Sequence, residues 1–298
     1  MSQQQANAPL FTLKNVGPNV WAVIEPGGLS NSGFVVGDDG VVVIDSFVNV
    51  DAAGAFSLEG AQQVLAEIRK VTSQPVKFVV NTHYHMDHVS GNSVFVDAGA
   101  KIVGQRNVRE WMYSETLRLF GNQIKPEQKA FVEAMPAPVV TYDEAITIHL
   151  GSRDIQVRSF PGHTGSDSIV VVPDAKTVFA GDLFWRNTLP NIMDGSIKSW
   201  LPTLHTLETD FRDYTFIPGH GDVGEVKDVA SFHEYLTTLH RLVSEAQATG
   251  KAGTALGEAL VPELQQKYGE WGFFNFFAQP NILDIDAELR GTKRVPQL

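Results

Sequence analysis

The chain has 298 residues, of which 43% are apolar and 19% charged, so it has enough apolar material for a large core and lacks the composition of a disordered protein. Its formal net charge is −11, and its lysines and arginines form no block. We therefore expect no nucleic-acid partner, because that kind of binding depends on neutralising phosphates with a basic surface. No apolar run approaches the ~20 residues that cross a bilayer, so we also expect no membrane partner.

The absence of cysteine limits both the chemistry and the compartment. It excludes disulfides, thiolate ligands and cysteine nucleophiles, so any metal must be bound through nitrogen and oxygen atoms. The segment Met1–Pro9 is polar and rich in glutamine, without the basic start and apolar core of a signal peptide. These features predict a cytoplasmic protein by default, and a periplasmic one if a signal peptide preceded this sequence and was removed.

Short apolar runs near the N-terminus predict strands at Val20–Ile24, Gly33–Val36 and Val41–Ile44. The turn residues Asp38-Asp39-Gly40 between the last two runs favour a tight hairpin. Apolar residues then recur at helical spacing over Ser57–Thr72, and Pro75 precedes another buried strand at Val76–Val80. Apolar strands separated by a helix predict a sheet that is covered by helices on its faces.

The second half of the chain also predicts strands followed by helices. The pattern is helical between Val103 and Met135, and strands are predicted at Ala145–Leu150, Ile155–Ser159, Ile169–Val172 and Val178–Ala180. Further helical patterns cover Ser196–Leu207 and Val226–Ala248, and a Phe-rich segment follows Trp271. We predict a single domain over 1–298, with two β-rich halves at about 10–135 and 136–224 and C-terminal helices over 225–298.

The densest group of chemically active side chains directly follows the strand at Val76–Val80. Residues 83–88 contain His83, His85, Asp87 and His88. In an extended segment His83 and His85 point to the same side, and a turn after Met86 would bring Asp87 and His88 beside them. The alternative is a loose cluster on an exposed loop, which is less expected for four such residues at the end of an apolar strand.

Three further segments place a histidine or an aspartate beside glycine at the end of a strand. They are Phe160–Ser168 with His163, Phe179–Leu183 with Asp182, and Ile217–Asp222 with His220. Alone, each residue is more often a turn former or a helix N-cap. Four strand ends in succession with such residues favour one shared site.

In this order, the motifs His-x-His-x-Asp-His, Pro-Gly-His-Thr, Gly-Asp and Pro-Gly-His-Gly resemble those of the metallo-β-lactamase superfamily. The resemblance extends from about Val20 to Ala248 and includes the segment Gly33–Asp45, which is typical of the opening strands of that fold. It implies an α/β (α+β) fold, the αββα four-layer sandwich of the metallo-β-lactamase type, with the metal site at one edge and a helical C-terminal extension.

The resemblance also implies a ligand set for two metal ions. The first ion would be bound by His83, His85 and His163, the second by Asp87, His88 and His220, and Asp182 would bridge the two. Asp45 would support the metal-binding loop through hydrogen bonds behind the ligands, and the alternative is an ordinary turn residue at the end of a strand.

The chemistry implied by the resemblance is that of a dinuclear metal hydrolase. Two zinc ions (Zn²⁺) are expected, although nitrogen and oxygen ligands also accept iron or manganese. A metal-bound hydroxide would attack a small carbonyl substrate (a lactam, as in β-lactamases, a lactone or a thioester), and Asp87 would orient it and receive its proton. The centre would keep about one positive charge, which favours a small-molecule substrate that bears a carboxylate.

Subgroups of the family differ in the residues at some ligand positions, and two of these positions in this chain, 85 and 182, are informative. A bridging aspartate such as Asp182 is similar to glyoxalase II and lactonases, whereas the commonest β-lactamases have cysteine there. A glyoxalase II-like thioesterase or a lactonase is therefore the specific alternative to a β-lactamase-like enzyme. A di-iron oxidoreductase fits less well because that branch usually has glutamate where His85 stands. A binding protein without turnover is disfavoured because all seven ligand positions are filled.

Aromatic residues in Asn107–Met135 and near the C-terminus predict an apolar wall over the site. The candidates for this substrate pocket are Trp111, Met112, Tyr113, Phe184, Trp185, Phe273 and Phe274. The alternative, which is the commoner use of such residues, is that they fill the core or form a homodimer contact. The remaining histidines, His149, His205, His233 and His240, have no glycine-loop setting and are expected on helices or the surface.

Overall fold

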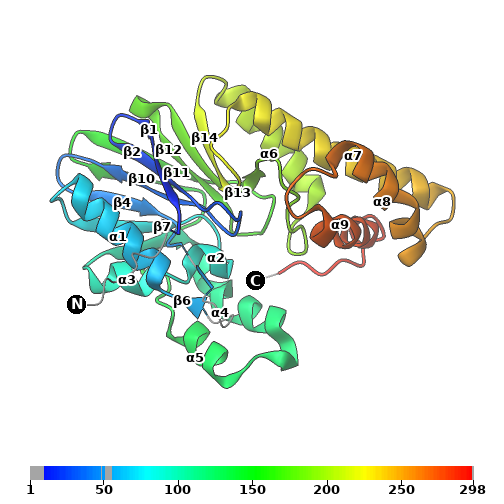
Figure 1. The fold of residues 1–298 in the computed structure, drawn as a ribbon, viewed down its shortest axis with the longest axis horizontal. Coiled ribbons are helices and arrows are strands. Elements are labelled where there is room, and N and C mark those ends of the chain that lie inside the picture. Colours follow the sequence, from blue (N-terminus) through cyan, green and yellow to red (C-terminus); the bar gives the residue numbers. More distant parts are fainter. Residues whose placement is uncertain (1–9, 48, 51–55, 297–298) are drawn as a thin grey trace, which may run out of the picture.

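Two β-sheets pack face to face and carry helices on their outer surfaces (Figure 1). The structure is a computed structural model that describes residues 10–47, 49–50 and 56–296. The layers follow one another as helix, sheet, sheet, helix, which confirms the predicted αββα sandwich and its helical C-terminal extension. Within these residues no helix is both long and apolar enough to span a bilayer.

The first sheet has the strand order β1-β2-β3-β4-β7-β8-β9. Its strands are β1 (Thr12–Gly17), β2 (Val20–Ile24), β3 (Ser32–Val36), β4 (Val41–Ile44), β7 (Val76–Asn81), β8 (Lys101–Gln105) and β9 (Val140–Tyr142). Strands β1 to β4 form an antiparallel meander, and β4, β7, β8 and β9 run parallel. The β3–β4 hairpin is closed by the Gly37 N–H, which donates to the Gly40 carbonyl over 2.9 Å, as the turn residues predicted.

The second sheet has the order β10-β11-β12-β13-β14. Its strands are β10 (Ala145–Leu150), β11 (Arg153–Ser159), β12 (Ser168–Val172), β13 (Thr177–Trp185) and β14 (Thr215–His220). The chain enters this sheet between Tyr142 and Ala145, so β9 of the first sheet lies beyond the predicted division at residue 135. A separate pair of two-residue strands, β5 (Asn49–Val50) and β6 (Phe56–Ser57), lies outside both sheets.

Helices make the crossovers that parallel strands require. They are α1 (Glu59–Val71), α2 (Met86–Val89), α3 (Asn92–Asp97), α4 (Arg106–Phe120), α5 (Pro126–Ala134), α6 (Ile197–Asp210), α7 (Val226–Ala248), α8 (Thr254–Tyr268) and α9 (Phe274–Leu289), with 3₁₀ turns at Gly121–Gln123 and Pro173–Ala175. Helices α7, α8 and α9 extend away from the sandwich on the right of Figure 1, and the chain after α9 runs back towards α4.

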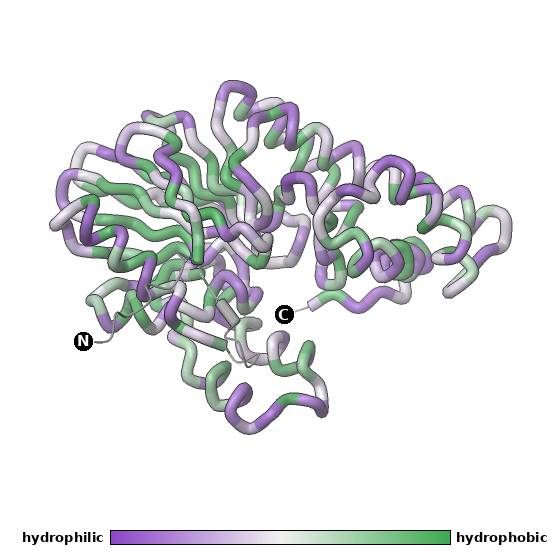
Figure 2. Tube along the Cα trace, in the orientation of Figure 1, coloured by the Kyte–Doolittle hydropathy of each residue, from purple (hydrophilic) through white to green (hydrophobic). Residues whose placement is uncertain are grey.

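The core consists of three apolar layers, because both faces of each sheet are covered. Along β4, Val42 and Ile44 face the second sheet, while Val41 and Val43 pack with residues of α1. This alternation explains why the strand is apolar at every position instead of at every second one. In Figure 2 the hydrophobic stretches accordingly follow the strands inside the sandwich.

One prediction about local structure was wrong, and one strand was missed. The segment from Val103 was expected to be helical, but Lys101–Gln105 forms β8 and the helix begins at Arg106, where the Gln105 side chain accepts a hydrogen bond from the Asn107 N–H. A short apolar run does not distinguish a strand from a buried helix, and here pairing with β7 and β9 decides. Strand β1 was not predicted because its side chains are polar and partly exposed.

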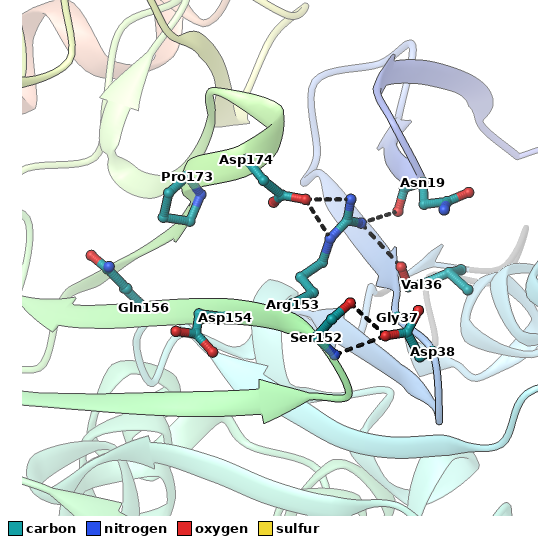
Figure 3. Close-up of a pocket in the computed structure, with 10 residues that line it drawn as sticks. All are labelled: Asn19, Val36, Gly37, Asp38, Ser152, Arg153, Asp154, Gln156, Pro173 and Asp174. Carbon is teal, nitrogen blue, oxygen red and sulfur yellow. Dashed lines mark hydrogen bonds and ion pairs between the residues drawn. The ribbon is translucent and has the colours of Figure 1, made fainter.

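Arg153, at the start of β11, joins the second sheet to the first through its guanidinium (Figure 3). Its guanidinium donates to the carbonyls of Val36 and Pro18, over 3.0 and 2.8 Å, and pairs with Asp174 over 2.7 Å. Beside it, Asp38 accepts hydrogen bonds from the backbone and side chain of Ser152. These groups line a hollow of about 380 Å³, but they bond to one another, so we assign them a structural role.

Candidate metal centre

The seven predicted ligands lie together at one edge of the sandwich. His83 and His85 follow β7, and the short helix α2 carries Asp87 and His88. The other three come from the second sheet, namely His163 from the β11–β12 loop, Asp182 from β13 and His220 from the end of β14. The structure therefore brings together residues that are up to 137 positions apart in a single cluster.

The ligand atoms form two groups, each with all its atoms within 4.8 Å of one another. The first group consists of His83, His85, His163 and Asp182, and the second of Asp87, His88 and His220. Among the described residues, no other histidine belongs to such a group. Histidine and carboxylate groups at this spacing are the donor set that zinc and similar ions use.

In the first group the ring nitrogens point to a common centre. His163 Nε2 lies 2.8 Å from His85 Nδ1 and 3.1 Å from Asp182 Oδ2. His83 Nε2 lies 3.7 Å from the same carboxylate oxygen. All four side chains are buried.

The second group has the same character and shares Asp182 with the first. His88 Nε2 and His220 Nε2 lie 3.2 and 3.3 Å from Asp87 Oδ2. His88 Nε2 also lies 3.1 Å from Asp182 Oδ1, and His220 Nε2 lies 3.2 Å from Asp182 Oδ2. The carboxylate of Asp182 thus lies between the two groups, within reach of both.

For four of the five histidines, the ring nitrogen that faces away from the centre is held by a hydrogen bond. His88 donates from Nδ1 to Asp45 Oδ2 over 2.8 Å, and His220 donates from Nδ1 to the Gly28 carbonyl over 2.8 Å. His83 Nδ1 lies 3.1 Å from Thr82 Oγ1, and His85 Nε2 lies 3.4 Å from Asp194 Oδ2. Such bonds select the tautomer and the orientation that a metal ligand needs.

Asp45 connects the supports of both groups. It has a left-handed backbone with φ of 55° and is buried directly after β4. Besides the bond from His88, its carboxylate accepts the backbone N–H and the hydroxyl of Thr82, both over 2.7 Å. Because Thr82 also contacts His83, one carboxylate orients a histidine of each group. Burial raises the pKa of Asp45 even though His88 and Thr82 act in the opposite direction.

Comparison with known proteins agrees with this geometry. A family model described as the metallo-β-lactamase superfamily matches residues 26–220, which is well over half of the chain. The chain belongs to this superfamily. Helices α7, α8 and α9 lie beyond the matched range.

Curated relatives of this metallo-β-lactamase superfamily chain carry different activities in their names. It is 23% identical over 205 residues to a linear primary-alkylsulfatase from a Pseudomonas species, covering 59% of this chain and 35% of the relative. It is 28% identical over 173 residues to a hydroxyacylglutathione hydrolase from Brucella ovis, covering 57% of this chain and 55% of the relative. The chain thus spans about half or less of the length of these relatives.

Among solved structures, a metallo-β-lactamase from Pontibacter korlensis has a similar fold. It aligns with a TM-score of 0.60 at 21% sequence identity and covers 76% of this chain and 99% of that chain. At this identity the likeness supports the shared fold alone.

The buried atoms of the centre fit the metal ions that the family implies. His83 Nε2, His88 Nε2 and Asp182 Oδ1 are buried and make no hydrogen bond to any residue that the structure describes. Buried polar atoms without partners are costly in a folded protein. One cation in each of the two groups would give all three atoms a partner, so the residues present fit a metal site.

The pKa values in the metal-free arrangement point the same way. Burial lowers the pKa of His163 to about 3, so this imidazole is neutral and has a free lone pair. Burial would also lower the pKa of His220, but Asp182 and Asp87 outweigh it and raise this pKa to about 9. A proton on His220 therefore compensates the two carboxylates when no metal does, and metal binding would displace it.

Two glycines allow the carboxylate of Asp182 to enter the centre. A Cβ atom at Gly219 would overlap with Asp182 Oδ1, so no side chain fits at this point of β14. Gly181 has φ of 50°, and a Cβ there would lie 2.6 Å from Thr82 Oγ1. The pairing of β13 with β14 is irregular on both sides of Gly181, which turns Asp182 towards the histidines.

The residues predicted for the substrate pocket are divided between the cavity and the core. A cavity of about 590 Å³ lies over the ligands, and both Trp185 and Phe273 line it. Trp111 and Met112 belong to a core cluster under α4, whereas Phe184 and Phe274 belong to the core between the second sheet and the C-terminal helices. Tyr113, also on α4, packs against the same cluster as Trp111 and donates its hydroxyl to the Met135 carbonyl.

Two carboxylates that sequence reasoning did not single out support the centre. Asp194 lies in the loop before α6 and accepts hydrogen bonds from the Tyr84 hydroxyl over 2.5 Å and from Arg118 over 2.7 Å, besides its contact with His85. Asp167 accepts hydrogen bonds from Thr164 and shapes the loop of His163. Asp167 follows the Pro-Gly-His-Thr motif closely enough to be suspected, but nothing in the sequence around Asp194 suggested this role.

We expect Asp194→Asn to weaken the binding of one metal ion by about tenfold or more, since loss of an outer partner commonly costs that much. The carboxylate holds His85, which belongs to the first group only, so the second ion should be affected less. Competition with a fluorescent chelator would measure both affinities. The exposed Asp97→Asn is the matched control, and equal metal affinities in the two variants would contradict the positioning role of Asp194.

Proposed function

We propose that the chain is a dinuclear zinc hydrolase that opens a small carbonyl substrate such as a lactone, a thioester or a lactam. The observation that carries this proposal is the position of the Asp182 carboxylate between two groups of converging imidazoles. His83, His85 and His163 would hold one ion, Asp87, His88 and His220 the other, and Asp182 both. Iron and manganese are the alternatives that the same donor atoms accept.

The bound ions would lower the pKa of water to about 7 and polarise the bond under attack. The chain itself contributes a fixed, mostly buried arrangement of ligands, with Trp185 stacked on the ring of His220 at a centroid distance of 3.7 Å. This stacking and the hydrogen bond to Gly28 leave His220 little freedom to turn away. Such preorganisation favours the transition state because no ligand has to reorient during the reaction.

Asp87 is the ligand we assign to proton transfer. Its side chain keeps about 30% exposure, more than the other ligands, and it lines the cavity. Burial would raise the pKa of Asp87, but the positive charges of His88 and His220 outweigh it and hold this pKa well below the usual range. The carboxylate is therefore ionised and can accept a hydrogen bond from the attacking water and take its proton transiently.

We expect Asp87→Asn to lower kcat by about a hundredfold or more, which is the usual contribution of a positioned acid–base group. Metal content, measured by elemental analysis, should stay close to that of the unchanged protein because an amide oxygen can still reach the ion. Asp87→Asn protein with both metals and full activity would contradict the proton-transfer role.

The thioesterase and lactonase alternatives have more support than a β-lactamase. An aspartate, Asp182, stands between the two groups, and one relative is named a hydroxyacylglutathione hydrolase. The di-iron oxidoreductase has less support, because a histidine occupies position 85 and its Nδ1 faces the centre. The formation of a homodimer and a cytoplasmic or periplasmic location stay predictions.

The experiment that tests the proposal is a substrate panel with zinc-loaded protein. The panel contains a lactone, a thioester, a lactam and a phosphodiester, together with a primary alkyl sulfate because of the alkylsulfatase relative. Hydrolysis of one carbonyl substrate that stops on chelation and returns with zinc supports the proposal. Turnover of the alkyl sulfate alone, or of none with both sites loaded, would overturn it. Two equivalents of iron and a coloured protein after purification without chelator would favour the oxidoreductase.

A further inference from the structure

The cavity over the metal centre differs sharply between its floor and its walls. Its floor consists of the predicted ligands His85, Asp87, His163, Asp182 and His220. Its walls are aromatic and aliphatic, and they are formed by Leu29, Phe56, Met86, Leu119, Phe120, Trp185, Phe273, Phe276 and Phe277. Among the residues that the structure describes, the only others that line the cavity are the uncharged Thr116 and Asn191. Its volume of about 590 Å³ lies within the range of ~300–1,000 Å³ that is usual for small-molecule sites.

Two separate parts of the chain supply opposite walls of this cavity. One wall comes from the end of α4, where Phe120 meets Phe56 at a ring-centroid distance of 6.0 Å. The other wall comes from the start of α9, where Phe273 and Phe277 lie 6.5 and 6.3 Å from the ring of Trp185. This second wall is formed by residues beyond the range 26–220 that the family model matches.

No lysine or arginine lines the cavity in the described part of the chain, and the undescribed residues contain neither type. Three cations of α4 and of the segment after α9 have other partners. Arg118 pairs with Glu115 over 2.5 Å and with Asp194 over 2.7 Å, and Arg294 pairs with Glu115 over 2.9 Å. Lys293 donates to the carbonyls of Ile192 and Gly195. The walls therefore offer nothing that could neutralise an anionic substituent.

The mouth of the cavity is apolar as well. Leu29, Leu119 and Phe276 line the cavity and still expose 45%, 40% and 70% of their surface. A group of exposed apolar side chains at one opening is more often part of a binding surface than an accident of exposure. An apolar ligand would cover them, and its burial would be favourable, whereas an unpaired carboxylate between these walls would be costly.

We propose that the cavity selects substrates whose acyl group is neutral and apolar, a hydrocarbon chain or an aryl group, with the scissile carbonyl at the metal floor. This inference rests on the proposed hydrolase function and narrows its substrate class. The positive charge of the metal centre alone would favour a substrate that bears a carboxylate. The acyl group, however, would contact the apolar walls instead of the charged floor, so we expect a neutral acyl group. A lactone or ester with a medium-length alkyl chain fits this description.

The test measures binding without turnover. N-methylamides of straight-chain acids compete with the neutral dye Nile red for the protein, and the assay is run on zinc-loaded and on chelator-treated protein. A second, matched series of amides carries a carboxylate at the far end of the chain. We expect affinity to rise about fourfold for each added methylene until the cavity is full. The carboxylate series should bind at least tenfold more weakly at equal length. Equal affinity of the two series, or no dependence on chain length, would overturn the proposal.

Variants at the mouth locate the binding site. Phe276→Lys should weaken the neutral series and strengthen the carboxylate series, so that the preference between them falls by tenfold or more. Val139→Lys is the matched control, because Val139 is 65% exposed and does not line the cavity. An equal change in the preference for neutral over carboxylated amides in both variants would overturn the proposal, because the change would then result from the added net charge and not from the cavity.

Failure of this inference can be distinguished from failure of the proposed function. Chain-length-dependent displacement by the neutral series, without hydrolysis of any matching ester, lactone or thioester, would support the apolar cavity and reject the hydrolase. Hydrolysis of neutral and carboxylated esters with equal kcat/KM would support the hydrolase and reject the selectivity of the cavity.

Discussion

Asp182→Asn should lower kcat/KM for the substrate identified in the panel by about 10²–10³-fold, the usual effect of removing one preorganised electrostatic group from an active site. The amide keeps the shape of the carboxylate, so the change removes charge and leaves the packing intact. Both metal groups should be affected, since His88 Nε2 lies 3.1 Å from Asp182 Oδ1 and His163 Nε2 lies 3.1 Å from Asp182 Oδ2.

Metal analysis gives a second readout for this variant. The metal content that remains bound after gel filtration should be lower in this variant than in the unchanged protein, because both ions lose a ligand. Loss of a ligand to a single ion would leave the second ion bound. Asp210→Asn, an exposed change at the end of α6, is the control for the loss of a negative charge. Asp182→Asn protein with a full metal content and normal kcat/KM would contradict the bridging position.

Removal of the metal ions should lower the melting temperature by about 10 °C. A ligand that binds only the folded protein contributes about 2.7 kcal/mol when its free concentration is a hundred times its Kd, and two such sites contribute about 5 kcal/mol. For a chain of this length, one kcal/mol corresponds to about 2 °C. The structure gives the physical reason, because buried imidazoles and carboxylates from four segments lose their common partner.

Differential scanning fluorimetry before and after dialysis against a chelator measures this shift, and added zinc should reverse it. Asp182→Asn protein should show a smaller shift than the unchanged protein, which separates the loss of metal from a direct effect of the chelator. An unchanged melting curve after verified metal removal would show that the cluster does not bind metal in the folded protein.

Local sequence patterns were sufficient to predict the fold class and most of the helices and strands. The runs that became β2, β4 and β10 and the helical pattern of α7 were predicted with the same bounds that the structure has. Turn residues bound these runs in the sequence, and helical spacing is sustained over the whole of α7. The prediction of β8 was wrong because its short apolar run can adopt either structure. Only the pairing with its neighbours, which are distant in the sequence, determines the outcome.

Residue type and spacing were also sufficient to single out the candidate ligands His83, His85, Asp87, His88, His163, Asp182 and His220. Histidines or aspartates at the ends of four strands, three of them beside glycine, are rare enough to be noticed in one sequence. The supporting role of Asp45 was expected from the family resemblance, with an ordinary turn residue as the alternative. What spacing could not provide was the partner of each outer ring nitrogen, such as Asp194 for His85.

The sequence by itself thus determined the fold class, the candidate ligands and the absence of thiolate ligands, since these depend on periodicity and on residue identity. Only the tertiary structure decided that Asp182 lies between both groups, that Asp194 supports His85, and that Trp185 and Phe273 face the centre while Trp111 and Phe184 enter the core. An aromatic side chain has the same apolar character in either place. Its position depends on how sheets and helices from distant parts of the chain pack, and no local pattern contains that information.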